Sequence, residues 1–447
     1  MTRFKYVLKR SGVKVPFTPQ RITNAIYRAA VSVGGRNREI AEQLTDQVIQ
    51  YMEQNLPQEH IPSVEEVQDA VEKTLIENGH ARVAKAYILY RDERARMRRQ
   101  REQETIRPSV NIPWSKIWQV LDWAADHDLH TVERYNQRLA KGELQQITSE
   151  SEIFYEEDIK LAAQAICRRR NEVKIVLISG PSSSGKTTTT IKVGQMLKQQ
   201  GISLVALNVD HYFHDLEKHP KDEFGDFDFE TPQALDLEMI NDHLEKLIHG
   251  KEVLIPFYDF RTGRRSDNHT PMRIGPGDII LIDSLHGLYP AMTEKIGPQN
   301  KFKLYLEPLL QMKDAQGNYI RWTDIRLMRR MLRDQAYRAY DPEKTLTHWH
   351  YVRTSEMRNI IPNHASADFI VNSAMPYELS IYKSKLRPNF TDWVAKFNQD
   401  PLREDAYTRA ARINTLFNEI AALDDDTFVP SDSVIREFIG GSSLNYH

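Results

Sequence analysis

The feature that most constrains this chain is the stretch from Lys174 to Thr190, KIVLISGPSSSGKTTTT. It begins with apolar residues typical of a buried strand and continues through a turn rich in glycine and serine. It ends where apolar residues recur at helical spacing, at Ile191, Val193, Met196 and Leu197. Residues 180–187 match the pattern G-x-x-x-x-G-K-[ST], in which glycines let the backbone wrap around a phosphate. Strand, loop and helix start together predict a phosphate-binding turn.

The residues of this loop have separate expected roles. The N–H groups at a helix start carry partial positive charge and would face a phosphate. The Lys186 ammonium would reach the β- and γ-phosphates, and the Thr187 hydroxyl would hold Mg²⁺. We therefore expect ATP and Mg²⁺ to bind through the loop residues Gly180, Ser182, Ser183, Ser184, Gly185, Lys186, Thr187 and Thr188.

The composition excludes several other classes of protein. The formal net charge of the 447 residues is −2, which argues against binding to nucleic acid or to a membrane surface. Cys167 is the one cysteine, so a disulfide framework or a multi-cysteine zinc site is excluded, and a reducing compartment fits. The N-terminal residues lack the apolar core of a signal peptide. We expect a cytoplasmic protein.

Strands and helices are expected to alternate after the phosphate loop. Apolar runs predict strands at 174–179, 203–209, 277–282 and 303–306, with helices up to residue 200 and over 234–249. This order is typical of an α/β fold with a parallel sheet and helices on both faces. Ligands of such sheets bind beyond the carboxyl ends of the strands. Side chains that directly follow strands are therefore the candidates for catalysis.

Charged residues stand at these positions. Asp210 follows the second expected strand, where a carboxylate could accept a proton from an attacking hydroxyl and help to hold the metal. Asp283 ends the third strand and is placed to organise Mg²⁺ with Thr187. Further on, arginines at intervals of three or four residues could share one helix face, at Arg326, Arg330 and Arg333. Such a helix is ordinarily a solvated face, but after two acidic strand ends we interpret it as a catalytic lid.

The rest of the chain is expected to be mainly helical. We divide the sequence into a small helical unit at 1–100, a helical connector at 101–170, the phosphate-loop segment at 171–385 and a helical tail at 386–447. In the first unit, Ser63 and Glu66 form the pattern of a capping box. In the connector, we expect Trp114, Trp118 and Trp123 to pack between modules.

Short motifs in the first unit resemble the ATP-cone, the nucleotide-sensing module at the head of many ribonucleotide reductases and of their transcriptional repressor. They are VLKRSG at 7–12, PF at 16–17, RI and AI at 21–26, VQDAVE at 67–72 and AKAYILYR at 84–91. The resemblance implies a regulatory site for an adenine nucleotide, ATP or dATP, whose phosphates meet Lys9, Arg10 and Arg21. We also expect a homo-oligomer. The alternative is a cone that serves structure or assembly without a ligand.

A second resemblance, over residues 172–385, is to the uridine kinase/phosphoribulokinase family. Its motifs follow the phosphate loop in order, as DHYF at 210–213, FDFETPQALD at 227–236, PFYDF at 256–260, DSLHG at 283–287 and RLMRRMLRD at 326–334. The family transfers the γ-phosphoryl group of ATP to a primary hydroxyl, typically the 5′-OH of a ribonucleoside. The resemblance implies that Asp210 is the general base. It assigns substrate contacts to Tyr212, Glu230, Tyr258, Phe260 and Arg265.

Three departures concern mainly the acceptor. The nucleoside kinases have an Asp where this chain has Glu230, a base-reading His where it has Gly263, and a Glu where it has Asp283. A nucleoside is the first expectation, and a sugar phosphate or phosphoglycerate is the alternative. Archaeal 2-phosphoglycerate kinases also join a cone to a phosphate-loop domain. A non-catalytic ATP-sensing regulator is a further alternative, against which the intact Lys186 and Asp210 argue. The motif VPSDSVIREFIGGS at 429–442 resembles the ending of bacterial uridine-kinase-like proteins and suggests no role.

Overall fold

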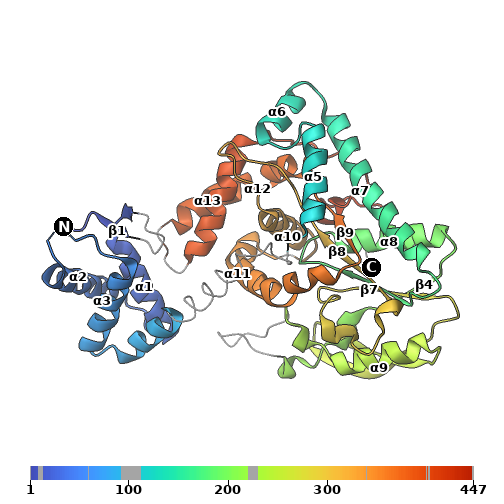
Figure 1. Cartoon of the computed structure of the whole chain (residues 1–447), viewed down its shortest axis with the longest axis horizontal. Coiled ribbons are helices and arrows are strands. Elements are labelled where there is room, and N and C mark those ends of the chain that lie inside the picture. Colours follow the sequence, from blue (N-terminus) through green and yellow to red (C-terminus); the bar gives the residue numbers. More distant parts are fainter. Residues whose placement is uncertain are drawn as a thin grey trace. The chain divides into compact units, whose positions relative to one another are not determined.

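The computed structural model describes residues 2–8, 14–58, 60–91, 112–219, 230–338, 340–398, 400 and 403–444. The chain forms two compact units. One comprises Met1–Ser109 with Gln399–Glu404, and the other comprises Val110–Asn398 with Asp405–His447. Figure 1 follows the chain from the blue N-terminal helices to the red C-terminal ones. Two of the residues expected at the effector site, Lys9 and Arg10, lie outside the described residues.

The N-terminal unit is a strand pair followed by helices. β1 (Tyr6–Leu8) and β2 (Lys14–Pro16) pair antiparallel. They precede α1 (Pro19–Ser32), α2 (Arg38–Asn55) and α3 (Val64–Glu77), and further helical turns span 81–91. The apolar faces of these helices share one core, which includes Phe4, Ile22, Ile26, Val48, Met52, Val71, Leu75 and Tyr87. The expected capping box is present, since Ser63 and Glu66 each bond the backbone of the other.

The larger unit is built on a parallel sheet, as the sequence predicts, but the sheet has five strands where the sequence indicates four. Its strands are β3 (Ile175–Ser179), β4 (Leu204–Ala206), β7 (Ile279–Asp283), β8 (Lys301–Glu307) and β9 (Phe369–Asn372), in the order β4-β7-β3-β8-β9. Every pair of neighbours is parallel. The strand that leads into the phosphate loop is therefore central, and its residues are fully buried.

Alternate residues of the sheet enter two separate cores, because successive side chains of a strand point to opposite faces. Val176 and Ile178 of β3 pack with α7 (Leu144–Arg168) and α8 (Lys186–Gln199). Ile175 and Leu177 pack on the other face with α9 (Leu237–Ile248). This two-faced burial explains why β3 is an unbroken apolar run rather than an alternating one.

The segments before and after the sheet pack into the core that contains Val176 and Ile178. They comprise α5 (Trp114–Asp126), α6 (Val132–Ala140), α10 (Trp322–Arg338), α11 (Pro342–Asn359), α12 (Glu378–Phe397), α13 (Glu404–Glu419) and the short α14 (Arg436–Ile439). Tyr135 of α6, Phe390 of α12 and Ile435, which directly precedes α14, belong to the same cluster as the strands. The connector and the tail thus cover the sheet in one compact unit. Trp123 packs as expected, but Trp114 is 54% exposed and Trp118 is 68% exposed.

An antiparallel hairpin, β5 (Val253–Asp259) and β6 (Arg264–Met272), was not expected from the sequence. The second strand is RRSDNHTPM, which has no apolar alternation because nearly all of its side chains are exposed. The hairpin turns at 260–263. None of the helices among the described residues is long and apolar enough to cross a membrane.

Candidate active site

The carboxyl edge of the parallel sheet collects the expected catalytic residues. The phosphate loop leaves β3 after Ser179, and Ile178 is in register with Asp283 at the end of β7. Asp210 lies in a 3-10 turn, Val209–Tyr212, just beyond β4, and its N–H is held by the side chain of Asn208 at 3.0 Å. Because the strands are parallel, residues that are far apart in the sequence meet at this edge.

The phosphate loop has the backbone that its glycines predict. Gly185, at the start of α8, has a φ of 90°, in the left-handed region. A Cβ on Gly180 would lie 2.4 Å from the backbone oxygen of Leu306, so only glycine fits there. The Oγ atoms of Ser183 and Ser184 are buried without a hydrogen-bond partner among the described residues. Unpaired buried hydroxyls beside a helix start fit the binding of an anion such as a phosphate.

Opposite charges meet beside the loop. The Lys186 ammonium donates to the carbonyl oxygens of Gly180 at 3.0 Å and of Pro181 at 3.3 Å. Burial lowers the pKa of Lys186, against the opposing charges of Asp283 and Glu437. Burial, together with the nearby carboxylates of Glu437 and Asp210, raises the pKa of Asp283 to about 6, against the opposing effects of the Lys186 charge and a hydrogen bond from Thr187.

The oxygens of Thr187, Asp283 and Asp210 are suitable ligands for Mg²⁺. No cluster of three or more acidic, His or Cys side chains in the described parts of the chain could hold a metal alone. Mg²⁺ usually keeps several waters and is bound by one or two carboxylates together with substrate phosphates. The residues present therefore fit a metal that enters with a nucleotide.

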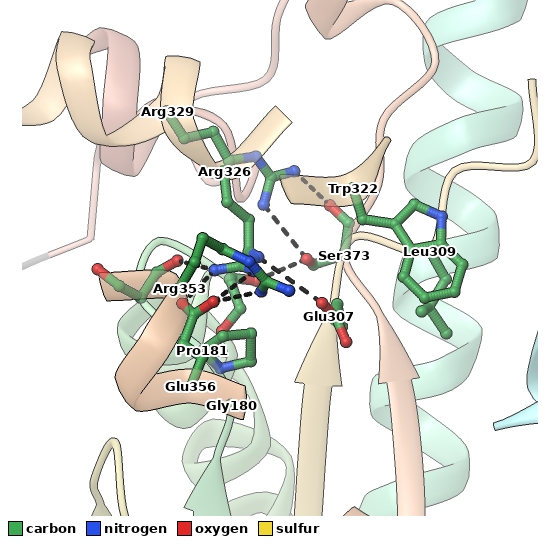
Figure 2. Close-up of polar contacts among 12 residues, drawn as sticks. Gly180, Pro181, Glu307, Leu309, Trp322, Arg326, Arg329, Arg353, Glu356 and Ser373 are labelled. Carbon is green, nitrogen blue, oxygen red and sulfur yellow. Dashed lines mark hydrogen bonds and ion pairs between the residues drawn. The ribbon is translucent and has the colours of Figure 1, made fainter. Parts of the chain in front are cut away.

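Two of the arginines in the expected lid helix are fully buried. Arg326 pairs with Glu356 through two hydrogen bonds (Figure 2). It also donates to the carbonyl oxygen of Ser182 at 3.1 Å. Arg329 binds Glu378 at 2.7 Å and the carbonyl oxygen of Ser373 at 2.7 Å. Arg326 thus supports the phosphate loop directly, and Arg329 does so through Ser373, whose hydroxyl donates to the carbonyl oxygen of Ser184 at 2.6 Å. The role of Arg326 in transfer remains a prediction.

The acids around Arg326 were not identified from the sequence. Glu307 ends β8, its carboxylate lies 3.7 Å from Arg326, and it accepts a hydrogen bond from Tyr305 at 2.8 Å. Burial tends to raise the pKa of Glu356, but Arg326 and Arg353 lower it below its ordinary value. A buried arginine that braces the loop requires such partners. Glu307 and Glu356 lie 19 and 30 residues from Arg326 in the sequence, on a strand and on another helix, with no spacing that a sequence pattern could reveal.

Arg330 and Arg333 have a different setting on the same helix, α10. Arg330 donates to the Ser182 hydroxyl and to Glu230, at 3.2 Å each, and its side chain is partly exposed. Arg333 pairs with Asp334 at 3.0 Å, and its charge acts to lower the pKa of Lys186. These two side chains therefore remain near the loop and reachable by a ligand.

The aromatic residues expected around the acceptor fall into two groups. Tyr258 and Phe260 pack against Phe213 in one cluster of tilted and edge-to-face rings, with ring centroids 5.0 to 5.8 Å apart. Tyr212 instead lies fully buried in the core on the α9 side, where its hydroxyl hydrogen-bonds His243 at 2.9 Å. The structure thus brings Tyr258 and Phe260 together but directs Tyr212 into the core.

Arg265 and Gly263 shape the hairpin beside this cluster. The Arg265 guanidinium binds Asp236 at 3.0 Å, so its charge is used within the protein. Gly263 has a φ of 67°, and a Cβ at this position would lie 2.9 Å from Cβ of Leu216. The place where a base-reading histidine would begin is therefore filled by Leu216 and requires a left-handed backbone. A histidine could not be accommodated without a shift of both segments.

His286 is a buried polar residue just beyond β7. It is 4% exposed, and neither ring nitrogen meets the geometry of a hydrogen bond to the described residues. Burial lowers its pKa to about 4, despite the nearby backbone of Glu230, so the ring is neutral at pH 7. The sequence places it in the DSLHG motif but does not indicate that it is buried.

Comparisons with known proteins agree with this architecture. The family model for the ATP cone domain matches residues 5–96, and that for the phosphoribulokinase/uridine kinase family matches residues 175–379. The uridine kinase of Deinococcus deserti is 28% identical over 198 residues, which cover 44% of this chain and 86% of that protein. Uridine-cytidine kinase 2-B of Danio rerio is 30% identical over 205 residues, which cover 44% of this chain and 72% of that protein.

Among solved structures, a possible uridine kinase from Bacillus stearothermophilus aligns with 48% of this chain and 98% of its own length. The TM-score is 0.33 and the sequence identity is 17%.

Proposed function

The chain belongs to the phosphoribulokinase/uridine kinase family, and on this premise we propose that it transfers the γ-phosphoryl group of ATP to a primary hydroxyl of a small molecule. The observation that carries the proposal is the meeting of Lys186, Thr187 and Asp283 at one edge of the sheet, with the charge of Asp210 near enough to act on Asp283. These are the groups that phosphoryl transfer requires, because its catalysis consists mainly of positioning and charge stabilisation.

The groups of the site divide the tasks of this mechanism, and Asp210 has two of them. The helix start and Lys186 hold the phosphates, and Thr187 with Asp283 and Asp210 would hold Mg²⁺, which neutralises charge on the phosphates when it is bound. Asp210 accepts the proton of the attacking hydroxyl. Arg330 and Arg333 are the arginines that can approach the transferring group, because Arg326 is committed to Glu356.

For the acceptor, the first candidate is the 5′-OH of a nucleoside, with Tyr258 and Phe260 beside it. The similarity to uridine kinases and the aromatic cluster support this candidate. One observation favours a second candidate, a sugar phosphate or phosphoglycerate. The position of the pyrimidine-reading histidine is Gly263, and Leu216 occupies the adjacent space. A site without a base-reading donor discriminates poorly between bases.

The experiment is an ADP-release assay of the full chain with a panel of nucleosides, pentose phosphates and glycerates, and Lys186→Ala serves as the inactive control. Turnover with one acceptor class, absent in the control, identifies the substrate. ADP release with no member of the panel, together with nucleotide-dependent changes in oligomer size, would favour the ATP-sensing regulator instead.

We propose further that the N-terminal unit binds ATP or dATP as an effector. Support comes from the match to the ATP cone domain and from Arg21, which is exposed on the first turn of α1. Calorimetry on the full-length Lys186→Ala variant isolates this second site, because its phosphate loop is impaired. Binding that Lys9→Ala/Arg10→Ala abolishes supports the proposal, and absence of adenine-nucleotide binding in the Lys186→Ala chain contradicts it.

A further inference from the structure

The C-terminal motif, to which the sequence assigns no role, lies against the phosphate loop. Its apolar residues Val434, Ile435 and Phe438 are fully buried, and Phe438 lies under the Arg329 guanidinium. Arg436 fixes the segment by donating to the carbonyl oxygens of Asp426 at 2.6 Å and of Val429 at 2.9 Å. The segment is therefore a built part of the larger unit, and its side chains have defined positions.

One side chain of this segment binds the loop directly. The Thr188 hydroxyl donates to Oε2 of Glu437 at 2.8 Å, and the Thr188 N–H donates to the same oxygen at 3.2 Å. Glu437 is 8% exposed. Next to it, a Cβ on Gly185 would lie 2.5 Å from Cγ2 of Val434, so the segment touches the loop at the residue that directly precedes α8.

The two donors of Thr188 are groups that a phosphate would use. Thr188 is the third residue of α8, so its N–H has no partner within the helix. In loops of this sequence pattern, the N–H groups at the helix start cradle the α- and β-phosphates. An oxygen of Glu437 and an oxygen of a phosphate cannot accept the same two hydrogen bonds together. Two anions at that distance would also repel each other strongly in a buried site.

We propose that Glu437 is an affinity-determining residue of the donor site, because its carboxylate holds the Thr188 donors for which a nucleotide phosphate competes. Binding of the nucleotide then requires the Glu437 side chain to leave Thr188. The buried segment around it keeps its place, since Arg436, Val434 and Phe438 are held by other contacts. The inference rests on the proposed donor site, and it assigns the C-terminal motif a role in setting how tightly the loop binds polyphosphate.

Two probes in the absence of an acceptor test this inference on the full chain. They are tripolyphosphate, which has no ribose or base, and ATP, each titrated by calorimetry. Glu437→Gln keeps the shape of the side chain and removes its charge. We expect the Kd for both probes to fall on the order of tenfold, as for the loss of one competing charged hydrogen-bond acceptor.

Asp432→Asn is the matched control. It removes one negative charge from the same segment, but its partner is Lys192 at 2.8 Å and not the phosphate loop. We expect its Kd for tripolyphosphate to stay within about twofold of the wild-type value, because distant exposed charges are largely screened. An equal gain in tripolyphosphate affinity in Glu437→Gln and Asp432→Asn would reveal a general charge effect and would overturn the inference.

Glu437→Asp provides a second variant if Glu437→Gln does not fold. It keeps the charge but withdraws the carboxylate by one methylene, so tripolyphosphate should again bind more tightly. Unchanged or weaker tripolyphosphate binding in a folded variant overturns the inference. Weaker ATP binding with unchanged tripolyphosphate binding also overturns it, because Glu437 would then contact the nucleoside part. Absence of tripolyphosphate binding in every variant would also overturn the inference. A wrong assignment of the acceptor would leave these titrations unaffected, because they contain no acceptor.

Discussion

The phosphate loop is held by buried contacts on several sides, whereas the tip of the β5–β6 hairpin is open. Arg326, Ser373 and Leu306 all lie against the loop backbone. At the hairpin tip, Phe260 is 60% exposed, and Arg265 is occupied with Asp236. A loop that must present fixed donors to a phosphate requires a rigid frame. The acceptor side is less constrained, so its residues can differ from those of relatives without loss of the fold.

The largest expected effect concerns the proton acceptor at the donor edge. Asp210→Asn should lower kcat by roughly 10²–10⁴-fold, the range for loss of a general base, with little change in ATP affinity. The measurement is a steady-state assay with the identified acceptor. Asp242→Asn on α9 is the control, since Asp242 forms an exposed pair with Lys246. Near-normal turnover of Asp210→Asn would remove the general base from the mechanism.

The two classes of arginine should separate stability from catalysis. Arg326→Gln leaves Glu356 buried without its main partner and should lower the free energy of unfolding by about 3–5 kcal/mol. Arg330→Gln should lower turnover and leave the unfolding transition close to that of the wild type, because Arg330 is partly exposed. Denaturant unfolding and kinetics on both variants provide the test. Equal losses of stability in the two variants would contradict the distinction between an arginine that supports the fold and one that acts in catalysis.

Asp283 should couple stability to pH. Its pKa rises from 3.8 to about 6 on folding, so the folded chain binds more protons between these values than the unfolded chain. The contribution of protonated Asp283 to the free energy of unfolding is therefore fully present below about pH 4, and it is lost as the pH rises through about 6. At pH 7.5, Asp283→Asn should be inactive yet more stable by about 3 kcal/mol, at 1.36 kcal/mol per pKa unit.

Melting curves of wild type and Asp283→Asn at pH 4 and 7.5 measure this coupling. The gain in stability of Asp283→Asn over the wild type should shrink toward zero at pH 4. Asp242→Asn should behave oppositely and weakly, since a hydrogen bond from Lys246 lowers the pKa of Asp242. A gain for Asp283→Asn that does not depend on pH would contradict the expectation.

The smallest expected effect lies in the hairpin. Gly263→Ala should destabilise the protein by about 1–2 kcal/mol, the usual cost of a left-handed conformation for a residue with a Cβ. Gly263→His should not create pyrimidine selectivity, because Leu216 fills the adjacent space. Gly250→Ala is the control, since it has a similar φ of 70° but no atom within 4 Å of its Cβ. An equal loss in both variants would show that backbone strain alone, without the Leu216 contact, accounts for the effect.

The sequence determined the parts of the molecule that depend on local patterns. The phosphate loop, the capping box at Ser63 and the parallel sheet were predictable, because glycine positions, cap residues and apolar runs act over a few residues. Asp283 at the end of β7 was predictable for the same reason, whereas β4 ends at Ala206, before the predicted strand end at residue 209, and Asp210 lies in the 3-10 turn that follows.

Only the tertiary structure decided which charged side chains are already paired within the protein. Arg326 and Arg330 are four residues apart on one helix, yet one is bound to Glu356 and the other lies beside Ser182 and Glu230. Similarly, Glu437 meets Thr188 across 249 residues. Helical spacing shows which residues share a face, but burial and distant partners decide whether a charge supports the fold or remains available to a ligand. The phosphate loop is thus a local motif whose donors are controlled by residues from the far end of the chain.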